Sequence, residues 1–311
     1  MNQQNFKGRI ISQHHSIYRV LCEGKELSAS VCGRFRHDAR TETDFPVVGD
    51  WVIVDRAEDT HGEGQILSVL PRRSLLTRTE AGTRQHSQAI AANLDYLFIC
   101  MSCNRDFNLS RLERYISIAA GAGITPVAVL TKSDLTDQAA QLAEAVRGAH
   151  SDLKIIVCSS SEGTGLQPIR QLLQEGVTAA FVGSSGAGKS TLTNALLGDE
   201  VMRTHAIRED DARGRHTTTH RQLLMMPNGC AIIDTPGMRT LSLDESRVAD
   251  VFDDIEQLVS SCRFGNCSHG KEPGCAVQAA LADGSLDTRR WESYCKLSRE
   301  EVHRRGRKRR Y

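Results

Sequence analysis

The sequence predicts an α/β fold in which a parallel sheet covered by helices follows a small β-barrel and precedes a helical module. Three observations support this prediction. Short β-type runs fill the first 75 residues, strands then alternate with helices, and cysteine and histidine residues cluster near the C-terminus. We therefore expect three domains, at residues 1–75, 76–243 and 244–311.

The composition is that of an ordinary soluble protein. The 311 residues are 40% hydrophobic and 25% charged, which is typical of globular domains. No apolar run is long enough to cross a membrane, and the N-terminal MNQQNFKGRI lacks the apolar stretch of a signal peptide. We expect a cytoplasmic protein without a membrane partner, and a monomer because no coiled-coil pattern is present. Since the ten cysteines are mostly scattered, metal binding explains any cluster better than disulfides.

The net charge of +1 hides an asymmetry. From residue 289 onward there are ten basic and three acidic residues, so this segment carries +7. A block such as RRGRKRR at 304–310 can bind phosphate backbones by Coulomb attraction and counterion release. A solvated tail is the alternative, and charge alone does not separate the two.

The first 75 residues show alternating β-type runs separated by glycine and aspartate turns. The runs lie at 17–23, 27–35, 50–55 and 64–70. This pattern predicts a small barrel. Trp51 follows the Gly49–Asp50 turn signal, and we expect it to pack in the core. Phe35 stands between Arg34 and Arg36, which would make a stacking and charge surface for RNA.

Strands alternate with helices from about residue 76. Expected strands lie at 94–101, 126–131, 154–159, 179–183 and 230–234, and expected helices at 109–122, 137–149 and 191–198. Such alternation predicts a parallel sheet covered by helices. Ligands of these sheets bind beyond the carboxyl ends of the strands.

GSSGAGKST at 183–191 has the pattern of a phosphate-binding loop between a strand and a helix. Its glycines allow a tight path that points backbone N–H groups inward, Lys189 can reach the β- and γ-phosphates, and Ser190 can bind Mg²⁺. The expected nucleotide contacts are Gly183, Ser184, Ser185, Gly186, Ala187, Gly188, Lys189, Ser190 and Thr191.

TKSD at 131–134 has the character of a guanine reader. The carboxylate of Asp134 can accept from guanine N1–H and the N2 amino group, which adenine does not offer, while the stem of Lys132 covers the base. Thr131 stands where asparagine is usual. Together with the serines that close the next strand, the expected base contacts are Thr131, Lys132, Ser133, Asp134, Ser159 and Ser160.

DTPG at 234–237 follows an apolar strand. Asp234 at a strand end can hold Mg²⁺ through water, and the N–H of Gly237 can sense a γ-phosphate. The Thr-rich GRHTTTH between the phosphate loop and DTPG indicates a switch. One of its threonines would complete the Mg²⁺ shell, and the sequence leaves the choice open among Thr217, Thr218 and Thr219.

The residue that would orient the attacking water is not the usual glutamine. Many GTPases carry a glutamine after the glycine of D-x-x-G, but Met238 occupies that position here. We therefore expect slow intrinsic turnover. His216 is the candidate catalytic residue for positioning water, and an exposed switch residue without that role is the alternative.

CRFGNCSHGKEPGC at 262–275 offers three thiolates and an imidazole, from Cys262, Cys267, His269 and Cys275. This ligand set suits tetrahedral Zn²⁺, and four protein ligands leave no open position, so the expected zinc is structural. Cysteines in a loop without metal are the alternative. Cys100 and Cys103 also form C-x-x-C, but we interpret them as packing residues of an apolar strand.

The base reader precedes the phosphate loop, whereas most GTP-binding chains have the opposite order. Since these segments need only be adjacent in space, the order indicates a circular permutation. With TKSD, GSSGAGKST, GRHTTTH, DTPG and the Cys/His cluster together, the chain resembles the ribosome small-subunit-dependent circularly permuted GTPases, RsgA or YjeQ, over nearly its whole length.

This resemblance implies an OB-like N-terminal barrel, a permuted P-loop GTPase domain and a C-terminal zinc-binding module. It also implies GTP and GDP as ligands, activation by the small (30S) ribosomal subunit, contacts with its rRNA, and a role late in subunit assembly. Because DTPG leads into the zinc module through an expected helix near 246–260, we expect γ-phosphate-dependent movement of that module. An RNA-binding scaffold with vestigial nucleotide hydrolysis and a small-molecule kinase are the competing hypotheses.

Overall fold

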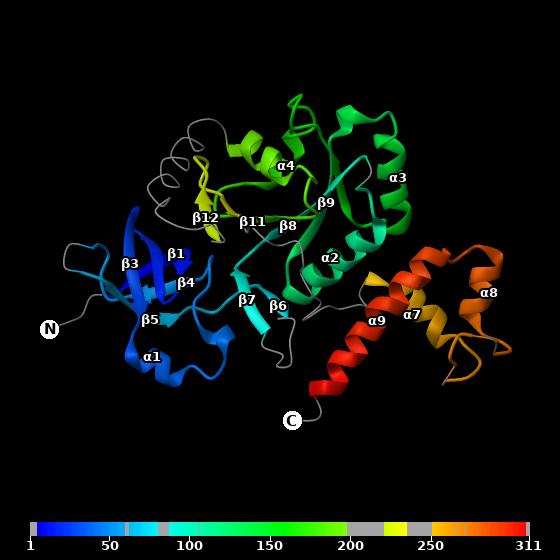
Figure 1. The fold of residues 1–311 in the computed structure, drawn as a ribbon, viewed down its shortest axis with the longest axis horizontal. Helices are drawn as coiled ribbons and strands as arrows, with labels where there is room; N and C mark the ends of the chain where they lie inside the picture. Colours follow the sequence, from blue (N-terminus) through cyan, green and yellow to red (C-terminus); the bar gives the residue numbers. More distant parts are fainter. Residues whose placement is uncertain are drawn as a thin grey trace.

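The computed structural model describes residues 5–59, 62–79, 87–104, 106–197, 221–234, 251–265, 267–270 and 272–308. One sheet of eleven strands has the order β10-β9-β8-β11-β13-β12-β1-β2-β3-β5-β4, and β6 and β7 form a separate hairpin. The barrel and the C-terminal helical module lie at opposite sides of the α/β domain (Figure 1).

The N-terminal barrel is closed, as the sequence predicts. Its strands are β1 (Phe6–His14), β2 (Ile17–Cys22), β3 (Lys25–Val31), β4 (Trp51–Val54) and β5 (Gly64–Val69). β1 pairs with both β2 and β4, and β3 pairs with β5, which closes the five-stranded ring. The inward-facing side chains, among them Ile10, Val20, Leu27, Val52 and Ile66, are fully buried.

Two details of the barrel differ from the sequence prediction. β1 has no counterpart among the expected runs, although its pairing with two other strands closes the barrel. The run at 27–35 is a strand only as far as Val31, because Cys32 caps the short helix α1 (Gly33–Asp38) by accepting from the N–H of Phe35 at 3.4 Å.

The α/β domain holds the remaining six strands of the large sheet. They are β8 (Tyr96–Ser102), β9 (Thr125–Thr131), β10 (Lys154–Val157), β11 (Thr178–Val182), β12 (Gln222–Met225) and β13 (Ala231–Asp234). All neighbouring pairs are parallel except β12 with β13. The carboxyl ends of the other five strands therefore lie at one edge of the sheet.

Helices cover both faces of this part of the sheet. α2 (Leu109–Ala122) and α3 (Ala139–Ala149) pack on one face, and α4 (Gln167–Leu172) and the helical residues 189–197 pack on the other. Successive side chains of β8 point to opposite faces of the sheet and enter different cores, because side chains alternate along a strand. Leu97, Ile99 and Met101 enter the first core, whereas Phe98 and Cys100 enter the second. The result is a three-layer α/β/α arrangement.

A buried ion pair anchors the segment between the barrel and the hairpin of β6 (Leu75–Thr79) and β7 (Ser87–Ala92). Arg72 donates to both carboxylate oxygens of Asp50, at 2.8 and 2.7 Å, and the Asp50 side chain is fully buried. The same guanidinium donates to the carbonyls of Thr43 and Phe45, and Asp50 accepts from the N–H of Val47. This one pair therefore orders the whole loop at 43–50.

The barrel joins the α/β sheet where β1 pairs with β12, at Ser12 and Gln222. Nearby, the buried guanidinium of Arg9 donates to the hydroxyl of Thr178 and lies 5.0 Å from the ring centre of Trp51. Burial lowers the pKa of Arg9 to about 10. Trp51 is half-buried at this junction, so the expectation that it packs in the barrel core is wrong.

The C-terminal module consists of α7 (Asp253–Ser260), α8 (Ala276–Asp283) and α9 (Thr288–Lys308). α7 occupies the end of the helix expected near 246–260. The module contacts α2 through the fully buried carboxylate of Glu113, which accepts from Arg289 at 3.2 Å and Arg290 at 3.5 Å. Arg290 also donates to Asp254 of α7 at 2.8 Å. Buried charges on both sides of this interface are thus paired.

Within the residues that the structure describes, no helix has the length and the apolar composition that crossing a membrane requires.

Replacing Asp50 by alanine should destabilise the protein by about 3–5 kcal/mol, because Arg72 would keep a largely buried charge without its partner. Chemical denaturation followed by circular dichroism measures the loss. Lys25→Ala is the control, since it breaks the solvent-exposed pair with Glu58 and should leave the transition where it is. Equal effects of the two substitutions would contradict the anchoring role of Asp50.

Candidate functional site

The predicted nucleotide site lies at the carboxyl edge of the parallel strands. β9 leads into the segment at 131–134, β10 into Ser159 and β11 into the loop at 183–191. β8 lies between β9 and β11. β9 and β10 are therefore added on one side of β8, whereas β11 and β13 are added on its other side. Such a switch point is where open α/β sheets bind ligands. The sheet therefore brings the base reader and the phosphate loop to one place.

The phosphate loop has a backbone that its glycines permit. Gly183, Gly186 and Gly188 have φ values of 140°, 84° and 82°, which side chains rarely adopt. A Cβ at Gly183 would also collide with the carbonyl oxygen of Cys100. Lys189 extends along the loop and donates to the carbonyls of Gly183 at 2.8 Å and of Ser184 at 2.6 Å. Its ammonium is thus already held over the loop.

The residues at 189–197 are helical, so the loop ends at a helix N-terminus. Free backbone N–H groups and the helix dipole favour an anion at this position. Ser185, Gly186, Ser190 and Thr191 are exposed, whereas Ala187 is buried. The exposed side of the loop is the side on which phosphates can bind.

The base-reading segment is anchored on two sides. Lys132 has a left-handed backbone, with φ 57°, and a Cβ on Gly188 would lie 3.8 Å from Lys132 Cε. Its stem therefore lies beside the phosphate loop. The N–H of Ser133 donates to the carbonyl of Cys158 at 3.2 Å, which attaches the segment to the end of β10.

The Asp134 carboxylate is exposed and ionised. A hydrogen bond from Ser159 lowers its pKa, and the hydroxyl of Ser161 donates to Asp134 Oδ2 at 3.2 Å. Ser159 is buried and Ser160 is half-buried between these two. Ser161 was not among the expected contacts, although it belongs to the same serine run. The structure thus presents an oriented carboxylate acceptor to solvent.

Thr131 connects the two halves of the site directly. Its side chain is buried, and its hydroxyl donates to the carbonyl of Ala187 in the phosphate loop at 2.7 Å. The hydroxyl also approaches the carbonyl of Met101 at the end of β8, at 3.3 Å. The substitution of threonine for the usual asparagine therefore keeps a side-chain link from β9 to the loop.

Asp106 is a contact of the phosphate loop that the sequence pattern did not reveal. Its carboxylate accepts from the hydroxyl of Ser184 at 2.5 Å and pairs with Arg111 of α2 at 2.8 Å. Asp106 precedes Asn108, the N-cap of α2, whose side chain accepts from the N–H of Arg111. The start of α2 is thus linked to the loop through one carboxylate.

The expected magnesium and catalytic residues fall mostly outside the described part of the chain. His216, Thr217, Thr218, Thr219 and Gly237 lie outside it. Asp234 ends β13 next to β11, so its backbone stands at the same edge as the phosphate loop.

The four residues predicted to bind metal converge. One ligand atom from each of Cys262, Cys267, His269 and Cys275 lies within 4.8 Å of the others. Cys262 Sγ is 3.5 Å from His269 Nδ1 and 3.9 Å from Cys275 Sγ. In tetrahedral zinc sites with Zn–S of about 2.3 Å, neighbouring ligand atoms are about 3.5–3.8 Å apart. The spacing fits zinc.

Hydrogen bonds between side chains and backbone, together with one ring contact, hold this cluster in shape. Cys275 is the N-cap of α8 and accepts from the N–H of Gln278 at 3.4 Å, while Gln278 donates to the carbonyl of His269 at 2.7 Å. His269 has a left-handed backbone, with φ 58°, and its ring meets Trp291 of α9 edge to face at 5.5 Å. The ligands are therefore positioned by α8 and α9.

Comparison with known proteins identifies the family. A model described as RsgA GTPase matches residues 69–244, which is more than half of the chain. The chain belongs to the RsgA GTPase family. The expected resemblance is confirmed. The predicted circularly permuted GTPase fold is confirmed as well.

Relatives of the RsgA GTPase family match nearly the whole chain. A protein of Lactiplantibacillus plantarum named small ribosomal subunit biogenesis GTPase RsgA 2 is 46% identical, over 94% of this chain and 82% of its own length. The small ribosomal subunit biogenesis GTPase RsgA of Opitutus terrae is 42% identical, over 96% and 85%.

Two solved structures share the fold. YjeQ from Thermotoga maritima superposes with a TM-score of 0.69 at 24% identity, covering 96% of this chain and 99% of its own. YloQ, described as a circularly permuted GTPase, gives a TM-score of 0.64 at 23% identity, covering 96% of each chain. Both confirm the predicted architecture.

Replacing Thr131 by valine should weaken GDP binding about fivefold, because the loss of the hydroxyl leaves the Ala187 carbonyl without its donor at a cost of about 1 kcal/mol. Titration with a fluorescent GDP analogue measures the dissociation constant. Thr125→Val, at the exposed start of the same strand, should leave it unchanged. GDP affinity equal to the unsubstituted protein for Thr131→Val would show that the link is dispensable.

Proposed function

We propose that this chain hydrolyses GTP as an assembly factor of the small ribosomal subunit and that the subunit stimulates the hydrolysis. The observation that supports this most is the meeting of an oriented carboxylate, Asp134, with the phosphate loop in a chain of the RsgA GTPase family. The names of the relatives supply the biological process. A cytoplasmic monomer that binds 30S rRNA accords with this role.

In the proposed nucleotide complex, each described segment has one task. Asp134 accepts from the guanine N1–H and N2 amino groups, and the Lys132 stem covers the base. The backbone N–H groups of residues 183–191 would surround the phosphates, Lys189 would offset their charge, and Ser190 would hold Mg²⁺. The base contacts would thus determine specificity, and the loop would hold the phosphates.

The proposed hydrolytic step depends on positioning and on charge stabilisation. Asp234 would hold Mg²⁺ through water, one of the threonines at 217–219 would complete its shell, and the N–H of Gly237 would sense the γ-phosphate. His216 would orient the attacking water, since Met238 has no group that can do so. Slow hydrolysis by the isolated chain follows from this reliance on a switch residue.

The cluster of Cys262, Cys267, His269 and Cys275 is proposed to bind one structural Zn²⁺. Closed four-ligand coordination contributes folding free energy and leaves no position for substrate. Because α8 begins at Cys275 and Trp291 of α9 packs on His269, zinc would fix the arrangement of these two helices. The metal would thereby orient the basic segment that follows.

Purified protein should hydrolyse GTP slowly alone and much faster with isolated small subunits, whereas large subunits or bare rRNA should have little effect. Lys189→Ala should lower the stimulated rate by at least about a hundredfold, because a charge that stabilises the transition state is lost. Phosphate release measures the rate. Tight GTP binding without stimulation by any particle would favour the RNA-binding scaffold instead.

Cys267→Ser should reduce bound zinc from one to none per chain, because serine is a poor zinc ligand. Inductively coupled plasma mass spectrometry on the purified chain measures the metal content. Cys295→Ser is the matched control, since Cys295 lies on α9 and is not among the clustered residues. A zinc content of zero in the unsubstituted protein would contradict the site.

A further inference from the structure

Helix α2 contacts both the parallel sheet and the C-terminal module. It packs against β8 and β9 and also against α9 (Figure 1). Its residues Leu112, Ile116 and Ala119 are buried in the same core as side chains of these two strands. Because close-packed interiors transmit displacement rather than absorb it, α2 moves as one body with its neighbours. Contacts at its first turn are therefore connected to both parts of the protein.

The start of α2 holds the phosphate loop through Asp106. One oxygen of the Asp106 carboxylate accepts from the Ser184 hydroxyl at 2.5 Å, and the other accepts from Arg111 Nη2 at 2.8 Å. The same Arg111 nitrogen donates to the Asp106 carbonyl. The carbonyl of Ser184 accepts from Lys189 Nζ at 2.6 Å. One carboxylate thus joins α2 to the residue that holds the phosphate-binding lysine.

Local contacts fix the position of Asp106. The N–H of Phe107 donates to the carbonyl of Asn104 at 3.4 Å, and the Phe107 side chain packs against the core that contains α2. Asn108 caps the helix by accepting from the N–H of Arg111 at 2.9 Å. The carboxylate is therefore presented to the loop from a rigid helix start, which lowers the entropy cost of ordering the loop.

Two residues after Arg111, α2 meets the C-terminal module. The Glu113 side chain is fully buried, and its two oxygens accept from Arg289 at 3.2 Å each. Arg290 lies 3.5 Å from the same carboxylate and donates to Asp254 of α7 at 2.8 Å. A buried carboxylate that loses its partners is strongly destabilising. The docked module therefore holds α2 in one position.

The two sets of contacts are close together on the helix. Arg111 and Glu113 are about 200° apart around the helix axis and about 3 Å apart along it. Both lie within the 14 residues of α2, so no flexible segment separates them. A shift of α2 that strains the contacts at one residue also displaces the other.

We propose that α2 couples the C-terminal module to the phosphate loop, with Asp106 as the positioning residue at the loop and Glu113 as the contact at the module. The inference rests on the proposed function, because that function supplies a nucleotide to the loop. Docking of the module then favours bound nucleotide, and bound nucleotide favours docking by the same factor, since coupling between two sites is reciprocal.

This coupling differs from the movement expected through DTPG. That movement requires a γ-phosphate, which only GTP carries. Asp106 instead acts on Ser184, in a loop whose backbone surrounds the α- and β-phosphates, and GDP carries both. Withdrawal of the module from α2 would therefore weaken GDP binding. Tests with GDP alone separate the two routes.

At the loop, Asp106→Ala should raise the dissociation constant of a fluorescent GDP analogue about tenfold, because a charge-assisted hydrogen bond that orders the loop is lost. Asp106→Asn should stay within about twofold of the unsubstituted chain. Its amide can donate to Ser184 Oγ and accept from Arg111. Glu144→Ala is the control, since it removes an exposed carboxylate that pairs with Arg147 on α3.

A double-mutant cycle separates positioning from a general loss of stability. Ser184→Ala should also weaken GDP binding, and Asp106→Ala added to it should weaken binding by less than about twofold more. Independent effects that multiply in the double variant, or GDP affinity unchanged by Asp106→Ala, would overturn the positioning role of Asp106.

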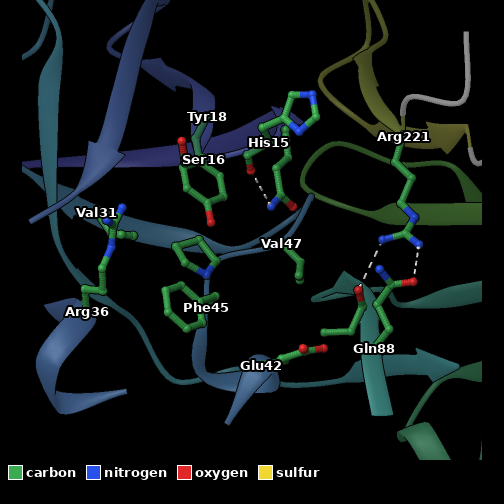
Figure 2. Close-up of a pocket in the computed structure, with 13 residues that line it drawn as sticks. His15, Ser16, Tyr18, Val31, Arg36, Glu42, Phe45, Val47, Gln88 and Arg221 are labelled. Carbon is green, nitrogen blue, oxygen red and sulfur yellow. Dashed lines mark hydrogen bonds between the residues drawn. The ribbon is translucent and has the colours of Figure 1, made fainter. Parts of the chain in front are cut away.

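At the module, Glu113→Gln should weaken GDP binding about threefold but have no further effect in the Ser184→Ala background. Asp254→Asn is the matched control, since Asp254 pairs with Arg290 from α7 rather than from α2. Gln88→Ala tests the other junction of the α/β domain, where Arg221 donates to Gln88 at 3.2 Å (Figure 2). Equal weakening by either control, or by Glu113→Gln in both backgrounds, would overturn the coupling.

Hydrogen–deuterium exchange tests the reciprocal effect on the unsubstituted chain, so the outcome does not depend on how well Glu113→Gln folds. GDP should slow exchange at residues 288–297 of α9 about threefold, and Asp106→Ala should abolish this protection. Exchange that GDP leaves unchanged would overturn the coupling. Absence of GDP binding by the unsubstituted chain would refute the proposed function as well, whereas GDP binding that no variant alters would refute the coupling alone.

Discussion

The parallel pairing of β9, β8, β11 and β13 is the constraint on which the rest of the molecule depends. It places the ends of strands from distant parts of the chain at one edge, where polar loops replace apolar strands. Thr131 and Ala187 are 56 residues apart, yet the hydroxyl of one donates to the carbonyl of the other. A site assembled in this way is insensitive to where the chain begins, which is why permutation leaves it intact.

Paired, buried charges lie at the connections to the flanking domains, in addition to the β1–β12 pairing and the apolar packing of the C-terminal helices. Asp50 with Arg72 orders the connection to the barrel, and Glu113 with Arg289 and Arg290 orders the connection to α9. Burial and the two arginines lower the pKa of the neighbouring His150 to about 4, which keeps its imidazole neutral at pH 7. Since a buried charge without its partner costs several kcal/mol, domain orientations that separate these pairs are disfavoured.

The parts of the site that depend on local backbone geometry could be predicted from the sequence. Glycines at 183, 186 and 188, the TKSD segment and the spacing of Cys262 to Cys275 each carry their chemistry within a short stretch. Contacts between distant segments could not be predicted, because no local pattern encodes them. Thus β1, the β6–β7 hairpin, Ser161 on Asp134 and Asp106 on Ser184 emerged only from the fold.

The position of the phosphate loop after β8, β9 and β10 has a consequence for the growing polypeptide. During synthesis, the base-reading half of the sheet is made first, and β8 and β9 can pair at once because they are neighbours in the chain. β11, which begins at Thr178, inserts beside β8 only after β9 and β10 have been made, and β13 follows later. The predicted nucleotide site therefore stays incomplete until most of the chain has been translated.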